Sequence, residues 1–304
     1  MNAKLILGVI AMLLSLNACA AAPTSHFSVQ VHEENGGPIE GVMVQGGFST
    51  LMRDYVPGPN VKAITDKDGK AEISGPAYFS VYVDAIKEGY YKSGRKIPVN
   101  QEKDQSISIL LRSKKNPIAM YAKKELVNAS DTRKSGEQFG YDFMAGDFVS
   151  PHGNGKVSDL LITHTYNKKD TWNYSYKTSI DFSNPDDGLI PFFIDKKFKD
   201  SDFKSNYNAP EKGYLNNWIV QGSREGKGKS VQGNKDKSRN YFFRVRTKTD
   251  KEGNVESAYY GKIYGEFLSI TYYLNPAIND RNVEFDSRQN LLKNLKHLEE
   301  VGAP

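Results

Sequence analysis

Residues 172–182, WNYSYKTSIDF, carry the clearest pattern in the chain. Aromatic and aliphatic side chains, with one threonine, alternate there with Asn, Ser, Lys, Ser and Asp. A period of two residues predicts a half-buried β-strand, because successive side chains of a strand point to opposite faces of its sheet. Residues 156–166 have a similar pattern, and the polar residues 167–170 between the two runs suit a turn. The sequence therefore predicts an antiparallel hairpin.

The first strand of this hairpin would carry on one face Leu160, Ile162, His164 and Tyr166. A histidine on an apolar strand face is more often a hydrogen-bonded core residue than a catalytic one. We therefore expect His164 to be structural.

The chain beyond residue 117 has further patterns that are typical of β-strands. A second hairpin is expected from residues 241–249, a turn at 250–254, and a long strand over 255–274. Leucines with helical spacing in 291–298 predict a short C-terminal helix. We therefore predict a β-rich domain of antiparallel hairpins over 117–304, ending in that helix.

Residues 221–239, between the two hairpins, are rich in Gly, Lys and Ser, with six basic and two acidic residues. Such a segment has too few apolar side chains to bury a core of its own. We expect a solvated, mobile loop here. The alternative is a segment that contacts anionic lipid or glycan phosphate.

A first domain is expected over 26–113. Short apolar runs alternate with polar residues and are separated by turn signals such as Asn35-Gly36-Gly37-Pro38 and Asp66-Lys67-Asp68-Gly69. About seven short strands with frequent turns and no helical period are typical of a β-sandwich. The charged residues 113–117, closed by a proline, suit a linker to the second domain.

The motifs of this first domain resemble those of the carboxypeptidase regulatory-like family. Val29 to Val44 has the form V-x-V, a turn, then G-x-P-I-x-G-V-x-V, and it is followed by Thr65-Asp66-x-Asp68-Gly69 and Gly89-Tyr90. The resemblance implies an immunoglobulin- or transthyretin-like sandwich. In that family the domain is an accessory module, so there are no catalytic residues to carry over. The segment 49–60 is longer than the pattern needs.

The N-terminus has the features of an export signal. Lys4 is followed by an apolar run from Leu5 to Leu14, which suits a signal peptide and is short for a transmembrane helix. Leu16-Asn17-Ala18-Cys19 resembles the lipobox of bacterial lipoproteins. We therefore predict a signal peptide over 1–18, lipidation of Cys19, and a tether over 19–25. The alternative is an ordinary signal peptide, cut at an Ala-x-Ala-like site within 18–22.

The cysteine content and the residue after Cys19 agree with an exported protein that is anchored to a membrane. Cys19 is the only cysteine, so no disulfide can form within the chain. The residue after it is Ala20 rather than Asp, which by resemblance to the sorting of lipoproteins in double-membraned bacteria favours the outer membrane, on its periplasmic face or at the cell surface. The net charge of +5 is spread along the chain, and we expect neither a nucleic-acid partner nor a cofactor.

The stretch 141–155 has the highest density of candidate ligand residues. It contains Asp142, Asp147 and His152, with three glycines and a proline, and Asp159 follows shortly after. Carboxylates and imidazoles are common metal ligands, and glycines allow a close approach of the backbone to a ligand. The spacing matches no known metal motif, so the metal stays unknown. The alternative is that these residues form turns at strand ends.

The sequence favours a non-catalytic lipoprotein that binds or scaffolds an envelope protein or a glycan, anchored to the membrane through lipidated Cys19. Eighteen tyrosines and fifteen phenylalanines suit the strands of such a protein and its contacts. The rival hypothesis is a metal-dependent envelope hydrolase with its site between Asp142 and His152.

Overall fold

The protein is all β in the part of the chain that the structure describes. The computed structural model describes residues 22–48, 60–100, 104–126, 134–267 and 269–304. These ranges form strands, turns and loops, with a single turn of 3-10 helix at Lys196–Phe198. No helix in them is long and apolar enough to cross a bilayer. The predicted signal peptide, Cys19, and nearly all of the predicted insert at 49–60 lie outside the described residues.

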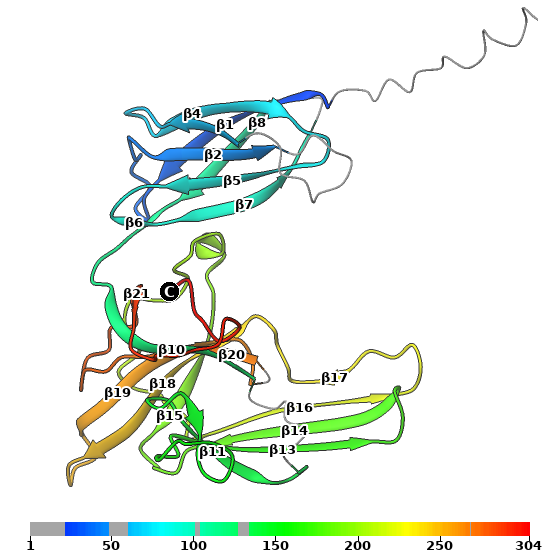
Figure 1. Ribbon diagram of the computed structural model, residues 1–304, viewed down its shortest axis with the longest axis vertical. Coiled ribbons are helices and arrows are strands. Elements are labelled where there is room, and N and C mark those ends of the chain that lie inside the picture. Colours follow the sequence, from blue (N-terminus) through cyan, green and yellow to red (C-terminus); the bar gives the residue numbers. More distant parts are fainter. Residues whose placement is uncertain (1–21, 49–59, 101–103, 127–133, 268) are drawn as a thin grey trace, which may run out of the picture. The chain divides into compact units, whose positions relative to one another are not determined.

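The chain divides into two compact units (Figure 1). The first runs up to Glu88 and also contains Lys92–Leu111, and the second contains Gly89–Tyr91 and Arg112–Pro304. Tyr90–Tyr91 (β6) pairs with Arg112–Ser113 (β9) within the second unit. The residues predicted as a linker are held there, because the amides of Lys115 and Asn116 donate to Glu284 at 2.8 and 2.7 Å.

The first unit consists of two sheets. One has the order β4-β1-β8 and is formed by Lys70–Pro76, Thr24–His32 and Gln105–Leu110. The other has the order β3-β2-β5-β7 and is formed by Asn60–Ile64, Met43–Phe48, Ser80–Ile86 and Ser93–Pro98. Strand β1 is antiparallel to β4 and parallel to β8.

The core of the first unit lies between these two sheets. Phe27, Val29 and Val31 of β1 are fully buried, as the alternating pattern predicts. The Phe27 ring lies 6.2 Å from the ring of Phe48 on the facing sheet. Gly75 is needed for this packing, because a Cβ there would come within 2.8 Å of the Phe48 ring. The predicted β-sandwich is confirmed.

The turn at 66–69 links the two sheets of the sandwich. Asp66 accepts hydrogen bonds from the amides of Asp68 and Lys70, and Gly69 has φ +73°. These contacts confirm the predicted turn. The strands on either side do not pair with each other, however, since β3 joins β2 and β4 joins β1.

Besides the β6–β9 pair, the second unit has two sheets, each of six strands. One has the order β15-β18-β19-β20-β10-β21 and is formed by Gly188–Phe193, Arg239–Thr249, Val255–Tyr264, Ser269–Leu274, Ile118–Leu126 and Phe285–Asn290. The other has the order β12-β11-β13-β14-β16-β17 and is formed by Asp147–Phe148, Gln138–Asp142, Leu160–Lys168, Asn173–Asp181, Asn217–Glu225 and Gln232–Gly233.

Both predicted hairpins of this unit are confirmed. Strands β13 and β14 pair antiparallel over eight residue pairs, from Leu161–Asp181 to Lys168–Tyr174. Strands β18 and β19 pair around the turn at 250–254. A buried cluster that includes Ile162 and Ile180 of one sheet and Phe243 and Tyr272 of the other packs the two sheets together.

Two predictions for this unit are wrong. The long strand expected over 255–274 is two strands, β19 and β20, because Gly265 has φ +93° and reverses the chain. The C-terminal helix expected over 291–298 is absent from these described residues, which form bends and turns. Asn294 has a left-handed φ of +58°, Leu292 packs against the core, and Leu298 is 84% exposed, so the leucines do not form one helical face.

A lysine side chain is buried in the interior of this unit. Lys262 of β19 is fully buried, and its ammonium group hydrogen-bonds Ser205 Oγ at 3.2 Å. The rings of Phe203, Tyr264 and Tyr273 surround that group at 4.4 to 5.1 Å from their centres. Burial lowers the pKa of Lys262 well below its usual range, because the charged form loses its water of hydration.

We expect Lys262→Met to raise the free energy of unfolding at neutral pH by about 1 kcal/mol or more, since methionine fills the space and needs neither a desolvated ammonium group nor the loss of a proton on folding. Between the lowered pKa and about 10.4, the unfolded chain binds a proton at Lys262 that the folded chain does not, so wild-type stability rises with pH. The advantage of the variant should therefore shrink toward about pH 10. Urea unfolding at several pH values measures both effects.

Lys251→Met, in the exposed turn after β18, is the matched control and should leave the pH dependence unchanged. A loss of stability for Lys262→Met at neutral pH would contradict the prediction. It would mean that the three rings and Ser205 hold a charged lysine in place.

Candidate functional site

The predicted acidic stretch folds into a small hairpin beside the core. Asp142 ends β11 and Asp147 begins β12, and the two residues face each other across that strand pair. Their carboxylates have different partners. Asp142 accepts from the amides of Met144, Ala145, Lys156 and Val157, and so ties the two ends of the loop together.

Asp142 and Asp159 are brought together by an arginine that the sequence did not point to. Arg246 of β18 donates to Asp142 Oδ1 at 2.8 Å and to Asp159 Oδ1 and Oδ2 at 2.8 and 3.0 Å. The carboxylates are almost completely buried. No local pattern could have identified Arg246, because it lies on a strand of the other sheet.

The two carboxylates respond differently to the same arginine. Burial raises the pKa of Asp159, and the hydrogen bond and charge of Arg246 only partly offset this effect. Burial opposes ionisation of Asp142 as well. Backbone amides from Lys156, Ala145 and Val157 outweigh that effect, with help from the Arg246 charge, and lower the pKa of Asp142.

Asp147 and His152 lie in the same loop, but their contacts are local. Asp147 accepts from the amides of Phe148 and Asn154 at 2.8 Å. His152 lies 3.2 Å from a carboxylate oxygen of Glu137, with its ring edge-on to Phe139. Within the described ranges, no group of three or more Asp, Glu, His or Cys side chains could hold a metal ion. The role of the four residues in ligand binding stays a prediction.

The sheet of β13, β14 and β16 carries a second candidate site, which sequence reasoning missed. The side of the sheet that holds Leu160, Ile162 and Ile180 in the core continues outward along the strands. Further along on that side lie the cross-strand pairs His164–Thr178 and Tyr166–Tyr176. The strands thus extend beyond the core, and the side chains on this side become partly exposed.

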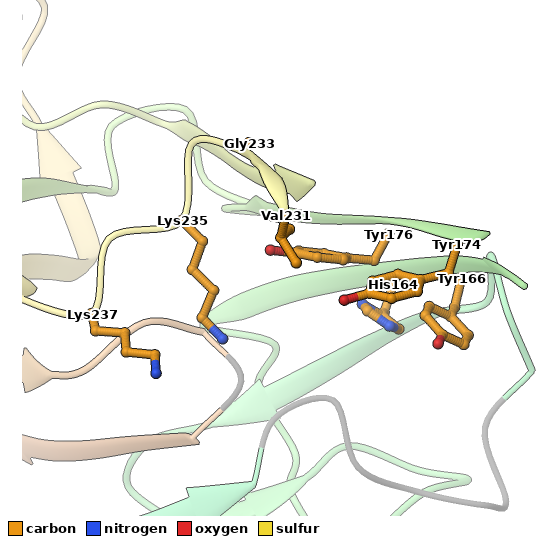
Figure 2. Close-up of a pocket in the computed structure, with 8 residues that line it drawn as sticks. All are labelled: His164, Tyr166, Tyr174, Tyr176, Val231, Gly233, Lys235 and Lys237. Atoms are coloured by element: carbon orange, nitrogen blue, oxygen red, sulfur yellow. The ribbon is translucent and has the colours of Figure 1, made fainter. Parts of the chain in front are cut away.

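These outer residues line a pocket of about 450 Å³, which we call the aromatic pocket. Its lining residues are His164, Tyr166, Tyr174, Tyr176, Val231, Gly233, Lys235 and Lys237 (Figure 2). The three tyrosines and the histidine come from the β13–β14 hairpin, and the others come from β17 and the residues beside it. The Tyr166 and Tyr174 rings lie 6.0 Å apart, and the His164 ring is nearly parallel to that of Tyr166.

His164 lies at the border between the core and the pocket. Its Nδ1 lies 2.9 Å from Oγ1 of the buried Thr178, which suits the expected structural role. The same ring also lines the pocket. Burial lowers the pKa of His164, which favours the neutral ring, and a neutral imidazole can both donate and accept a hydrogen bond.

The segment predicted as a mobile loop builds one wall of the aromatic pocket. Residues 217–225 are strand β16, and β17 turns back to pair with it at Gly222–Gly233 and Ser223–Gln232. Asn234 extends this pairing, because its side chain accepts from the Gln221 amide and donates to Ile219 O. The prediction of a solvated, mobile loop over 221–239 is therefore wrong for the residues in β16, β17 and β18, while the turns at 226–231 and 234–238 are mostly exposed as expected.

Two glycines permit the close approach in this wall. A Cβ on Gly222 would lie 2.8 Å from the Tyr176 hydroxyl, so only glycine lets that ring lie against the backbone of β16. A Cβ on Gly233 would lie 2.2 Å from Gln221 O. Both glycines stand in a segment whose Gly content suggested flexibility in the sequence.

The aromatic surface continues past the pocket to the end of the hairpin. Trp172 is 38% exposed and precedes β14. The guanidinium group of Arg224 lies over its ring at 4.4 Å. Arg224 is also the cross-strand neighbour of Tyr174. An elongated molecule could therefore contact rings from the pocket out to Trp172.

Comparisons with known proteins found only distant structural similarity. No family model and no curated protein sequence matches the chain. The 3-chlorocatechol 1,2-dioxygenase of Rhodococcus opacus 1CP is 15% identical over 30% of this chain, with a TM-score of 0.24, and the match spans only 60% of that enzyme's length.

Two further solved structures match over most of their length. A DUF3823 family protein from Parabacteroides merdae ATCC 43184 is 8% identical over 87% of this chain and 100% of its own, with a TM-score of 0.22. The major pilin subunit of Bacillus cereus is 12% identical over 88% of this chain and 97% of its own, with a TM-score of 0.24. Scores this low carry no argument about the site.

We expect Arg246→Met to lower the free energy of unfolding by about 3–5 kcal/mol, because it leaves two buried carboxylates without their cation. The backbone cost of the left-handed φ at Arg246 is common to both side chains, so the comparison isolates the charge. The loss should shrink in acid as Asp159 and Asp142 take up protons. Urea unfolding of the full chain measures it.

The matched control is Arg288→Met, which removes an exposed arginine that pairs with Asp286. This control should lose much less stability, since water and salt already screen the pair. Equal losses in the two variants would contradict a dominant role of Arg246 in holding the loop.

Proposed function

We propose that the protein is a lipid-anchored protein of the outer membrane that binds a glycan through the aromatic pocket. The observation that carries the proposal is the partly exposed group of Tyr166, Tyr174 and Tyr176 beside a pocket of about 450 Å³. The acidic loop at 141–159 is a weaker candidate, because its two buried carboxylates are already engaged by Arg246 and by backbone amides.

The chemistry of sugars matches the lining of this pocket. A pyranose ring has an apolar face made of C–H groups and an edge of hydroxyl groups. Tyrosine rings offer broad apolar contact at a small cost in conformational entropy, and their hydroxyls can donate or accept hydrogen bonds. His164 and the backbone around Gly233 add polar groups at the edge of the pocket.

The size of the pocket also suits an oligosaccharide. It falls in the range that small-molecule sites usually have. The Arg224–Trp172 pair lies beyond its outer end, so a chain of several sugar units could run along the hairpin. A folded protein partner would instead need a flat interface much larger than this pocket.

The first unit fits the proposal as a spacer. We infer from the motifs at 29–44, 65–69 and 89–90 that it is an accessory domain of the carboxypeptidase regulatory-like kind. A lipid on Cys19 would hold this unit at the membrane. The sandwich would then lie between Cys19 and the glycan-binding unit along the chain.

We expect Tyr174→Ala and Tyr176→Ala each to weaken glycan binding by about tenfold or more, because a ring that stacks on a ligand contributes roughly 1 kcal/mol beyond its buried area. The probe is the detergent-solubilised full chain on an array of neutral and acidic oligosaccharides. Calorimetry with the best ligand then gives the affinities.

Tyr82→Ala is the matched control, since Tyr82 is 49% exposed on β5 of the first unit. It should bind as the wild type does. Absence of binding across the array, or unchanged affinity of both pocket variants, would reject the proposed function.

The proposed anchor has its own test. We expect Cys19→Ser to abolish incorporation of radiolabelled palmitate and to shift the protein from the membrane fraction to the soluble fraction, because serine has no thiol to accept the lipid. Ser15→Ala, within the signal peptide, is the control and should leave labelling unchanged. Labelling of the Cys19→Ser variant would contradict a lipid anchor at this residue.

A further inference from the structure

Charge is distributed unevenly around the aromatic pocket. Lys235 and Lys237 line it, and both are exposed. They stand two residues apart in the segment after β17, and Figure 2 shows both side chains extending from that segment on the same side. Neither lysine is among the residues that form ion pairs within the described ranges.

The acidic residues near this segment are occupied by other partners. Glu266 is almost fully buried and accepts from Arg239 at 2.8 Å, from the Tyr241 hydroxyl at 3.0 Å and from the Asp236 amide at 3.1 Å. Asp236 accepts from the amide and the hydroxyl of Ser238. Neither carboxylate forms an ion pair with Lys235 or Lys237, and these two lysines with Asp236 leave a net positive charge at this side of the pocket.

The aromatic rings restrict where a negative charge could lie. The face of a tyrosine ring carries the negative part of its quadrupole and repels an anion, while it accepts C–H groups. An acidic ligand would therefore place its sugar ring over the tyrosines and its acid group toward the lysines. The pocket offers these two environments side by side, on the hairpin and on the segment after β17.

We propose that the aromatic pocket selects sugars that carry a negative charge, with Lys235 and Lys237 binding the acid group while the tyrosines stack on the sugar ring. This inference rests on the proposed glycan binding. The acid could be the carboxylate of a uronic acid or a sulfate ester, because an ammonium group recognises both as point charges.

The test compares matched pairs of ligands. Uronic-acid oligosaccharides with galacturonate, glucuronate or mannuronate units are each paired with their carboxyl-reduced, neutral form, and sulfated oligosaccharides are paired with desulfated ones. We expect the full chain in detergent to bind at least one acidic member about tenfold or more tightly than its neutral partner. The preference should fall as salt is raised, because salt screens exposed charges.

The protein variant is Lys235→Gln/Lys237→Gln, in which both charges are removed and the side chains remain long and polar. We expect it to lose the preference for the acidic ligand and to keep the affinity for the neutral one. Lys251→Gln, in the exposed turn after β18, removes a lysine of the same unit far from these residues in sequence and should keep the preference. Lys235 and Lys237 are exposed, so their replacement should not change the fold, and circular dichroism checks this.

Each outcome decides between distinct statements. Equal affinity for acidic and neutral partners would overturn the charge selection and leave glycan binding standing. No binding to any glycan would reject the proposed function itself. Binding to phosphatidylglycerol vesicles that depends on the two lysines, with no preference among sugars, would replace the sugar acid by a lipid headgroup.

Discussion

The second unit depends on one constraint: three paired strands extend further than the core that covers them. The inner side of β13, β14 and β16 begins as core at Ile162, Ile180 and Val220. The same side ends in Tyr166, Tyr174 and Tyr176, where it is only partly covered. One period of two residues therefore serves packing at one end and an exposed aromatic surface at the other. The proposed binding site lies where the core stops covering these strands.

The hairpins could be predicted because their signals are local. Alternation and a short turn set both the strands and their register, so residues 156–182 were enough to place β13 against β14. The third strand could not be found in the same way, since 217–225 shows no clear alternation and is held in place by pairing with β14. The helix predicted over 291–298 shows the opposite case, in which a local pattern was misleading. Leucine spacing favoured a helix, but contact of Leu292 with the core and the left-handed Asn294 determine the conformation there.

The acidic loop shows why residue type alone did not define a site. Sequence reasoning selected Asp142 and Asp159, and the structure does bring them together, yet it does so around Arg246. A buried carboxylate needs donors and a compensating charge, and a metal ion or an arginine can supply the charge equally well. The choice between them depends on a residue from the other sheet, which no spacing within 141–159 encodes. The aromatic pocket was missed for the related reason that its two walls are remote in sequence.

The same contrast between buried and exposed charge bears on the pocket. Two arginines of this unit are enclosed by rings or by carboxylates: the buried Arg112 by the rings of Phe198, Phe203 and Tyr207, and the partly buried Arg246 by two aspartates. A ligand cannot use such charges, because their partners already compensate them. Lys235 and Lys237 differ in being exposed beside a lining of tyrosines. Salt at physiological strength screens exposed charges beyond about 8 Å, so lysines remote from the pocket contribute little at this position. Any preference of the pocket for acidic ligands must then come from charges that lie beside it, such as these two side chains, rather than from the small net charge of the protein.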